Sequence, residues 1–121
     1  MNEEGQEIKE RCFNFSLRVI DFIDLFPKTT ATLIITRQLV RSATSIGANL
    51  VEGSDACSKK EFINYLNISR KSARETIYWL EMIKHKKWVG EKETEILIKE
   101  ATEIRKIIST IIINTKKNSK L

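Results

Sequence analysis

Residues 7–27 read EIKERCFNFSLRVIDFIDLFP and decide the fold class of this chain. Apolar side chains recur there in alternating steps of four and three residues, the spacing of the buried face of an amphipathic helix. Pro27 ends the segment because proline donates no backbone hydrogen bond and disfavours helical angles in the residue before it. The residues of this face are Ile8, Cys12, Phe15, Val19, Phe22 and Phe26.

A second helical segment follows Pro27. Thr29 or Thr30 suits its N-cap, and Gly53 suits the left-handed position just beyond its end. Gly47 inside the segment costs about 1 kcal/mol relative to alanine, so close packing by a neighbour is expected there. The expected apolar face of this segment consists of Leu33, Val40, Ala43, Ile46 and Leu50.

Two more segments complete the pattern. Ser58-Lys59-Lys60-Glu61 matches a capping box, in which a hydroxyl and a carboxylate satisfy two free backbone N–H groups. The last segment begins among glutamates and ends at Lys116-Lys117. Negative charge at the start of a helix and positive charge at its end both interact favourably with the helix dipole. We therefore expect one domain over residues 1–121, with helices at about 6–26, 30–53, 58–84 and 91–116.

Composition agrees with an all-α fold. The 121 residues include only four glycines and one proline, too few for the tight turns of a sandwich or barrel. Four helices of about 30 Å each, joined by short loops, predict an up-down-up-down antiparallel four-helix bundle. No apolar run approaches the roughly 18 residues of a membrane span, and the first residues are acidic, unlike a signal peptide. A cytoplasmic protein is expected.

Charge is uneven along the chain, whose net charge is +5. Residues 1–36 hold six acidic and four basic side chains, whereas residues 37–121 hold ten and seventeen. Two interpretations remain open at this point. The asymmetry can direct a polyanion to one side of the molecule, or it can supply complementary faces for self-association.

No catalytic, cofactor-binding or metal-binding site is predicted. The single histidine, His85, lies among lysines, which disfavour the imidazolium that a catalytic base must form. Cys12 and Cys57 have no CxxC spacing and are expected to be free thiols. Phosphate-binding loops, zinc spacings and paired Glu-x-x-His motifs are absent from the sequence.

Polar side chains lie close to the apolar faces of the second and third segments. If these segments fold back at residues 54–57, Arg37 falls near Arg74 and Glu75, and Arg41 falls near Arg70. Glu75 then pairs with Arg37 or, within a turn, with Arg41. These groups either fix the register of two helices or line a polar pocket, and the first alternative is favoured because buried polar groups usually bond one another.

Residues 37–53, RQLVRSATSIGANLVEG, resemble the QLxRSAxSIxxNxxEG signature of small four-helix-bundle proteins encoded in intervening sequences of bacterial 23S ribosomal RNA genes. Residues 61–75 are similar to the EFxxxLxIAxGSxxE pattern of the same family, with Ser69 and Lys71 as departures. We interpret the matching residues as determinants of fold and assembly rather than as an active site. They include Arg37, Arg41, Ser42, Asn49, Glu52, Gly53 and Glu75.

The resemblance implies a homo-oligomeric ring, commonly a pentamer, with a role in binding nucleic acid. Related accessory proteins of diversity-generating retroelements are basic pentamers that bind nucleic acid and partner a reverse transcriptase. We expect ribosomal or other structured nucleic acid to bind a basic surface, and the alternative is a protein-interaction scaffold without such binding. The candidate binding residues are Lys59, Lys60, Arg70, Lys71, Arg74, Lys84, Lys86, Lys87 and Trp88.

Overall fold

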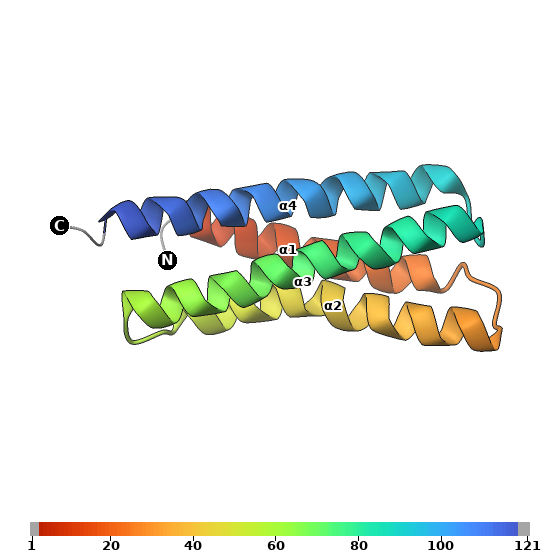
Figure 1. The fold of residues 1–121 in the computed structure, drawn as a ribbon, viewed down its shortest axis with the longest axis horizontal. Coiled ribbons are helices and arrows are strands. Elements are labelled where there is room, and N and C mark those ends of the chain that lie inside the picture. Colours follow the sequence, from red (N-terminus) through yellow and green to blue (C-terminus); the bar gives the residue numbers. More distant parts are fainter. Residues whose placement is uncertain (1–2, 119–121) are drawn as a thin grey trace.

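The computed structural model describes residues 3–118. Its four helices are α1 (Glu3–Ile23), α2 (Thr30–Ser54), α3 (Lys59–Lys86) and α4 (Glu91–Asn118). Consecutive helices pack against each other and α1 also packs against α4, which closes the bundle (Figure 1). α1 begins and α4 ends at the same end of the molecule, as an up-down-up-down order requires. The predicted fold class is confirmed.

The core follows the predicted period of α1 closely. All six residues of the predicted face of α1 are buried, and Cys12 and Val19 are fully so. The other helices supply mainly leucine and isoleucine, with small residues where α2 meets its neighbours. The largest buried side chains of α2, α3 and α4 are Leu39, Ile46, Leu50, Leu66, Leu80, Ile83, Leu97, Ile104 and Ile108.

The first half of α2 differs from the prediction. Leu33 is 53% exposed, and threonines at 32 and 36 occupy the buried positions instead. Thr36 donates its hydroxyl to the carbonyl of Thr32 at 2.7 Å, so its polar atom is satisfied inside the helix. Thr32 also exchanges hydrogen bonds with the N-cap Thr29 in a capping box. A helical threonine with a satisfied hydroxyl fills a core position that a hydrophobicity pattern assigns to leucine.

Helix ends depart from prediction by up to three residues. α1 ends at Ile23. The next residues form turns whose backbone hydrogen bonds span three residues instead of four, such as the bond from Phe26 N–H to the Ile23 carbonyl at 3.3 Å. Proline disfavours α geometry in Phe26, which nevertheless stays in the core. α3 continues to Lys86, two residues past the expected end, and Lys87 takes the left-handed C-cap with φ 56°.

The predicted capping box of α3 forms in part. Ser58 Oγ accepts from the N–H of Glu61 at 3.1 Å, as predicted. The Glu61 carboxylate accepts from the N–H of Cys57, at 3.4 Å, instead of that of Ser58.

Gly53 does not have the predicted left-handed role. It lies inside α2, is buried, and has no positive φ. A Cβ built on it would lie 3.1 Å from the Cβ of Tyr65 and 3.3 Å from Leu66 Cδ1, so a larger residue would require α3 to move away by a few tenths of an ångström. Gly47 has the same role toward α1, where a Cβ would lie 3.2 Å from the Cβ of Cys12. This confirms that close packing accompanies Gly47.

A bidentate ion pair joins α1 to α4. The Nε and Nη2 atoms of Arg11 each donate to a carboxylate oxygen of Glu100 at 2.7 Å. This side-chain hydrogen bonding lowers the pKa of Glu100 and raises that of Arg11. Arg18 and Glu93 form a second bridge between the same helices at 3.1 Å. α1 and α4 are thus joined by charge as well as by apolar packing.

Gly47→Val should destabilise the protein by about 1–3 kcal/mol, because the added methyl groups meet the Cβ and backbone of Cys12. Urea denaturation followed by circular dichroism measures the change. Gly90→Ala is the matched control, since nothing lies within 4 Å of a Cβ there, and it should alter stability by less than about 0.5 kcal/mol. Equal effects of the two substitutions would contradict the close approach of α1 and α2.

Glu100→Gln should lower the free energy of unfolding by about 1 kcal/mol at neutral pH. The folded pKa of Glu100 is lowered, so its contribution is complete above the unfolded pKa of about 4.3 and is lost as pH falls through the folded value. The wild type and Glu100→Gln should therefore converge in stability in acid. Urea titrations between neutral pH and acid measure this, with Glu103→Gln as the exposed control on the same helix. A difference that grows in acid would contradict the ion pair.

Candidate nucleic-acid interface

α3 and its C-cap carry most of the predicted binding residues and expose six basic side chains that form no ion pair among residues 3–118. The helix has 28 residues and is therefore about 42 Å long. We call five of these six, four on α3 and one at its C-cap, the basic stripe: Lys60, Lys71, Arg74, Lys86 and Lys87. Lys59 is also exposed, in the first turn of α3. The structure thus spreads the predicted residues along one helix rather than gathering them in one patch.

Contacts with neighbouring helices fix the two sides of α3. Ser72 and Glu75 bond to α2, which places Ile68 and Trp79 on the same side, since residues three, four and seven apart share a helix face. Lys84 pairs with Glu95 of α4, so Arg70 and Arg74 fall toward α4. Lys71 and Tyr78 point outward between these two sides.

Two predicted residues on the α4 side already have partners. Arg70 is half-buried and donates to Asn67 Oδ1 at 2.9 Å. Lys84 Nζ lies 3.1 Å from Glu95 Oε1, and this hydrogen bond raises the pKa of Lys84. Arg70 and Lys84 are therefore less available to an external anion than the basic stripe.

Trp88 packs at the end of the bundle. It is half-buried, and its ring lies 6.1 Å from that of Phe26 in an edge-to-face arrangement. The ammonium group of Lys86 lies 5.9 Å from the Trp88 ring centroid, within the range of a cation–π contact. Trp79 donates its indole N–H to Glu75 at 2.9 Å. Both tryptophans are thus engaged within the chain.

α4 also exposes basic side chains that lie outside the predicted set, among them Lys99 and Lys106. Lys99 and Lys106 are seven residues apart and therefore lie on the same outward side of that helix. A seven-residue spacing is the sequence signal for such a pair, whereas the predicted set includes residues of the continuous run Lys84-His85-Lys86-Lys87.

The signature residues build a polar layer between α2 and α3. Ser45 and Ser72 bond through their hydroxyls at 2.9 Å, and Thr76 donates to Ser42 Oγ at 2.9 Å. Ser69, at a departure from the family pattern, donates to the carbonyl of Ile46 at 2.7 Å. Asn49 donates to the carbonyl and hydroxyl of Ser45. Among residues 3–118, no buried side-chain polar atom lacks a hydrogen-bond partner, so this layer fits the register-fixing interpretation.

Glu75 pairs with Arg41, one of the two partners that were predicted for it. Arg41 also donates to Gln38 Oε1 at 3.0 Å, whereas Arg37 is exposed and forms no ion pair within residues 3–118. Glu52 is exposed as well. The predicted proximity of Arg41 to Arg70 is wrong, because Arg41 pairs with Glu75, five positions further along α3.

The error in register has two physical causes. The connection between the helices covers residues 55–58, later than the assumed 54–57. In addition, Cα–Cβ bonds tilt toward the N-terminus of each helix, so side chains that face each other come from residues about one position later on both helices. Both effects shift the contact toward Glu75.

The histidine and the cysteines do not lie in a metal-binding cluster of residues 3–118. His85 Nδ1 lies 2.9 Å from the carbonyl oxygen of Glu81. Within the described range 3–118, no three His, Cys, Asp or Glu side chains gather as a metal site would require, and no helix is apolar enough to cross a membrane. Burial raises the pKa of the Cys12 thiol to about 12, whereas Cys57 is exposed.

Comparison with known proteins gives one family. Residues 4–110 match the family described as 23S rRNA-intervening sequence protein. A solved structure of a protein of unknown function from the S23 ribosomal protein family, from Bacteroides thetaiotaomicron, is 33% identical in sequence. The match covers 90% of this chain and 97% of that chain, with a TM-score of 0.84. No curated protein matches.

The native protein should have one reactive thiol. A disulfide reagent at about pH 8 should label Cys57 within minutes and leave Cys12 unlabelled, because only a thiolate attacks and the Cys12 thiol stays protonated and buried. Denaturant should release the second equivalent. Labelling of both thiols at the same rate in the native protein would contradict the packing of Cys12.

Proposed function

This chain belongs to the 23S rRNA-intervening sequence protein family, and we propose that it is a cytoplasmic, non-enzymatic homo-oligomer that binds structured nucleic acid through α3. A pentameric ring is the assembly that the resemblance implies. The family name connects these proteins with ribosomal RNA genes. The observation that carries the binding proposal is the basic stripe, five exposed cations that form no ion pair within residues 3–118.

The distribution of ion pairs supports this use of α3. The four ion pairs described in residues 3–118 neutralise Arg11, Arg18, Arg41 and Lys84. The cations of the basic stripe take part in none of them. Lysines and arginines that are not neutralised internally are the groups that displace counterions from a phosphate backbone. Assembly would repeat the stripe in every subunit and add the +5 of each chain.

The expected mode of binding is through phosphates. Trp79 and Trp88 are half-buried and have internal partners, so these two rings are poorly placed to stack on single-stranded bases. Contacts from lysine and arginine to phosphates position a nucleic acid but carry no sequence information. Binding should therefore be strong at low salt, weak at high salt and tolerant of sequence.

The polar residues of α2 and α3 support a non-enzymatic role. Ser42, Ser45, Ser72 and Thr76 bond one another across the helix pair, so their hydroxyls are committed to the fold. A nucleophilic hydroxyl would instead need a base within reach that is positioned to accept its proton.

A protein-interaction scaffold without nucleic-acid binding is the second candidate. The observation that favours it is the set of large apolar side chains that the chain leaves exposed on α1, among them Phe13, Leu17 and Ile20. Such side chains on one helix face mark interaction surfaces. The binding experiment below separates the two candidates.

Lys60→Glu combined with Arg74→Glu should weaken binding of a fluorescent rRNA hairpin at least about tenfold at low salt. The variant should also reduce the slope of log K against log salt by about one per lost phosphate contact. Fluorescence anisotropy over a range of salt concentrations measures both, and a DNA duplex of similar length tests the choice of nucleic acid.

Lys28→Glu combined with Lys117→Glu is the matched control. It produces the same change of net charge at exposed positions outside α3, and it should lower the affinity far less. Equal losses in the two variants would show that net charge alone attracts the RNA. No binding of either nucleic acid at low salt by the wild type would overturn the proposal in favour of the scaffold.

A further inference from the structure

Two aromatic side chains of residues 3–118 are largely exposed, and they lie on helices of opposite charge. Phe13 of α1 is 64% exposed and Tyr78 of α3 is 59% exposed, whereas the other phenylalanines, tyrosines and tryptophans are buried or half-buried. α1 has five acidic and three basic side chains, and α3 has three acidic and seven basic. Within the described residues, Tyr78 is thus the one open ring on a positively charged helix.

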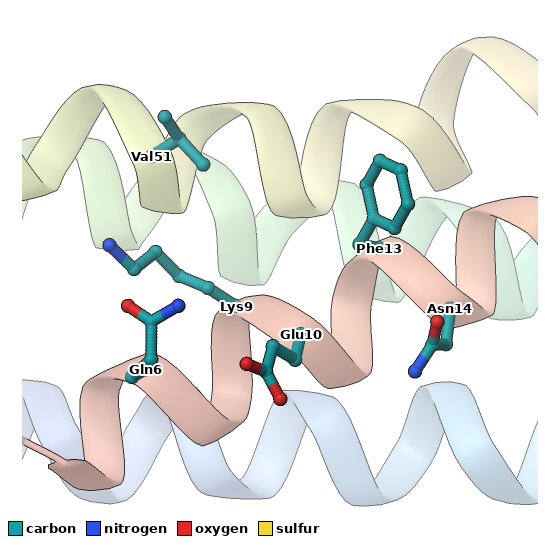
Figure 2. Close-up of a pocket in the computed structure, with 6 residues that line it drawn as sticks. All are labelled: Gln6, Lys9, Glu10, Phe13, Asn14 and Val51. Atoms are coloured by element: carbon teal, nitrogen blue, oxygen red, sulfur yellow. The ribbon is translucent and has the colours of Figure 1, made fainter.

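The surroundings of Phe13 do not suit a polyanion. Figure 2 shows Phe13 on the α2 side of α1, with Lys9 and Glu10 on the preceding turn of the same helix. These two opposite charges offset each other, and the other two cations of α1 form ion pairs with α4. Phe13 therefore has no surplus of positive charge beside it.

The surroundings of Tyr78 are basic on one side of the ring. Arg74 and Lys71 lie four and seven residues before Tyr78, which is about 6 and 10 Å along the helix axis. Both cations are exposed, and neither forms an ion pair within residues 3–118. Glu81 lies three residues after the ring, on its other side. A phosphate attached to a group on the ring is therefore attracted toward Arg74 and Lys71 and repelled by Glu81.

A series of contacts from α2 supports the position of the Tyr78 ring. Glu75 pairs with Arg41 of α2 and accepts the indole N–H of Trp79 at 2.9 Å. The Trp79 ring packs edge to face with Tyr78, with centroids 5.2 Å apart and 71° between the planes. This contact covers part of the Tyr78 ring and leaves more than half of the side chain exposed. A ring that is held in place before a ligand arrives loses less entropy on binding.

An exposed ring beside two free cations suits a flat group that is linked to phosphate. An unpaired nucleotide has this chemistry, because its base can stack on an aromatic side chain while its phosphates contact lysine or arginine. Bases inside a continuous duplex are stacked on their neighbours and do not reach such a ring. Folded RNA presents unpaired bases in bulges and loops.

We propose that Tyr78 stacks on an unpaired base of a structured RNA while Arg74 and Lys71 bind the phosphates beside that base. The preferred substrate is thus a duplex that is interrupted by a bulge or a loop, rather than a continuous duplex. This inference rests on the nucleic-acid binding proposed above and names the feature of the nucleic acid that α3 recognises. Because every base has a flat face, the contact adds a preference for unpaired nucleotides without a preference for sequence.

Two matched RNA duplexes test the proposal. One is blunt and fully paired, and the other has the same sequence with a short adenosine bulge at its centre. Fluorescence anisotropy at low salt should give the wild type at least about fivefold higher affinity for the bulged duplex. Tyr78→Leu should remove this preference and leave the affinity for the paired duplex unchanged, because leucine is apolar but has no flat ring. Tyr78→Phe should keep the preference.

Phe13→Leu is the matched control. It removes the other exposed ring of residues 3–118, from a helix without surplus positive charge, so the preference for the bulged duplex should not change. Circular dichroism verifies that the three variants are helical. Equal losses of the preference in Phe13→Leu and Tyr78→Leu would overturn the assignment of the contact to α3.

A photochemical cross-link locates the contact in the wild type. A 5-iodouridine placed in the bulge bonds on irradiation to an aromatic ring that is stacked on it, with loss of hydrogen iodide. Digestion with trypsin and mass spectrometry should find the nucleotide on the peptide of residues 75–84, and fragmentation should place it on Tyr78. A cross-link to any other residue would overturn the proposal.

The outcomes keep this inference separate from the proposed function. Equal affinity of the wild type for the two duplexes would overturn the stacking contact and leave phosphate binding by the basic stripe standing. An equal loss of affinity for both duplexes in Tyr78→Leu would also overturn it, because the ring would then not distinguish the bulge. No binding of either duplex at low salt would overturn both proposals.

Discussion

The close approach of α2 to both of its neighbours shapes the rest of this bundle. Glycine permits two tight contacts, Gly47 against Cys12 of α1 and Gly53 against Tyr65 of α3. At such short separations large side chains do not fit, so serine and threonine hydroxyls bridge α2 and α3 directly. Directional hydrogen bonds then fix the register of the pair, a role that interlocking leucines have in wider bundles.

The same constraint has a consequence on the surface. Because Gly47 and Ala48 leave the α1 side of α2 nearly bare, Phe13 and Val51 stand above a shallow groove instead of covering it. Arg41 of α2 also pairs with Glu75 of α3, which neutralises a negative charge on the α2 side of α3. One tight interface thus leaves a shallow apolar groove between α1 and α2, and α3 exposes cationic side chains. Self-association and phosphate binding are both consistent with this arrangement.

Sequence reasoning was most accurate where one signal dominated. The six-residue face of α1 was predicted completely, because large apolar side chains at a helical period have no alternative to burial. It failed at Leu33 because Thr32 and Thr36, whose hydroxyls donate to nearby carbonyl oxygens, take the buried positions instead. It failed for Gly53 because a glycine near a helix end suits both a left-handed cap and a close contact. The choice depends on the neighbouring helix, which a single sequence does not show. The candidate binding residues were chosen from the sequence because they are basic or aromatic. Which of them lie toward α2 and which toward α4 depends on how those helices pack against α3.

The central claim is that identical subunits assemble into a closed ring. Native mass spectrometry of the unmodified chain tests this claim most directly. The account predicts one dominant species, an integral multiple of the 14.0 kDa chain, that keeps the same mass as protein concentration rises. A ladder of masses that lengthens with concentration would indicate an open fibre, and a 14.0 kDa monomer throughout would indicate no assembly. Either result would contradict the account.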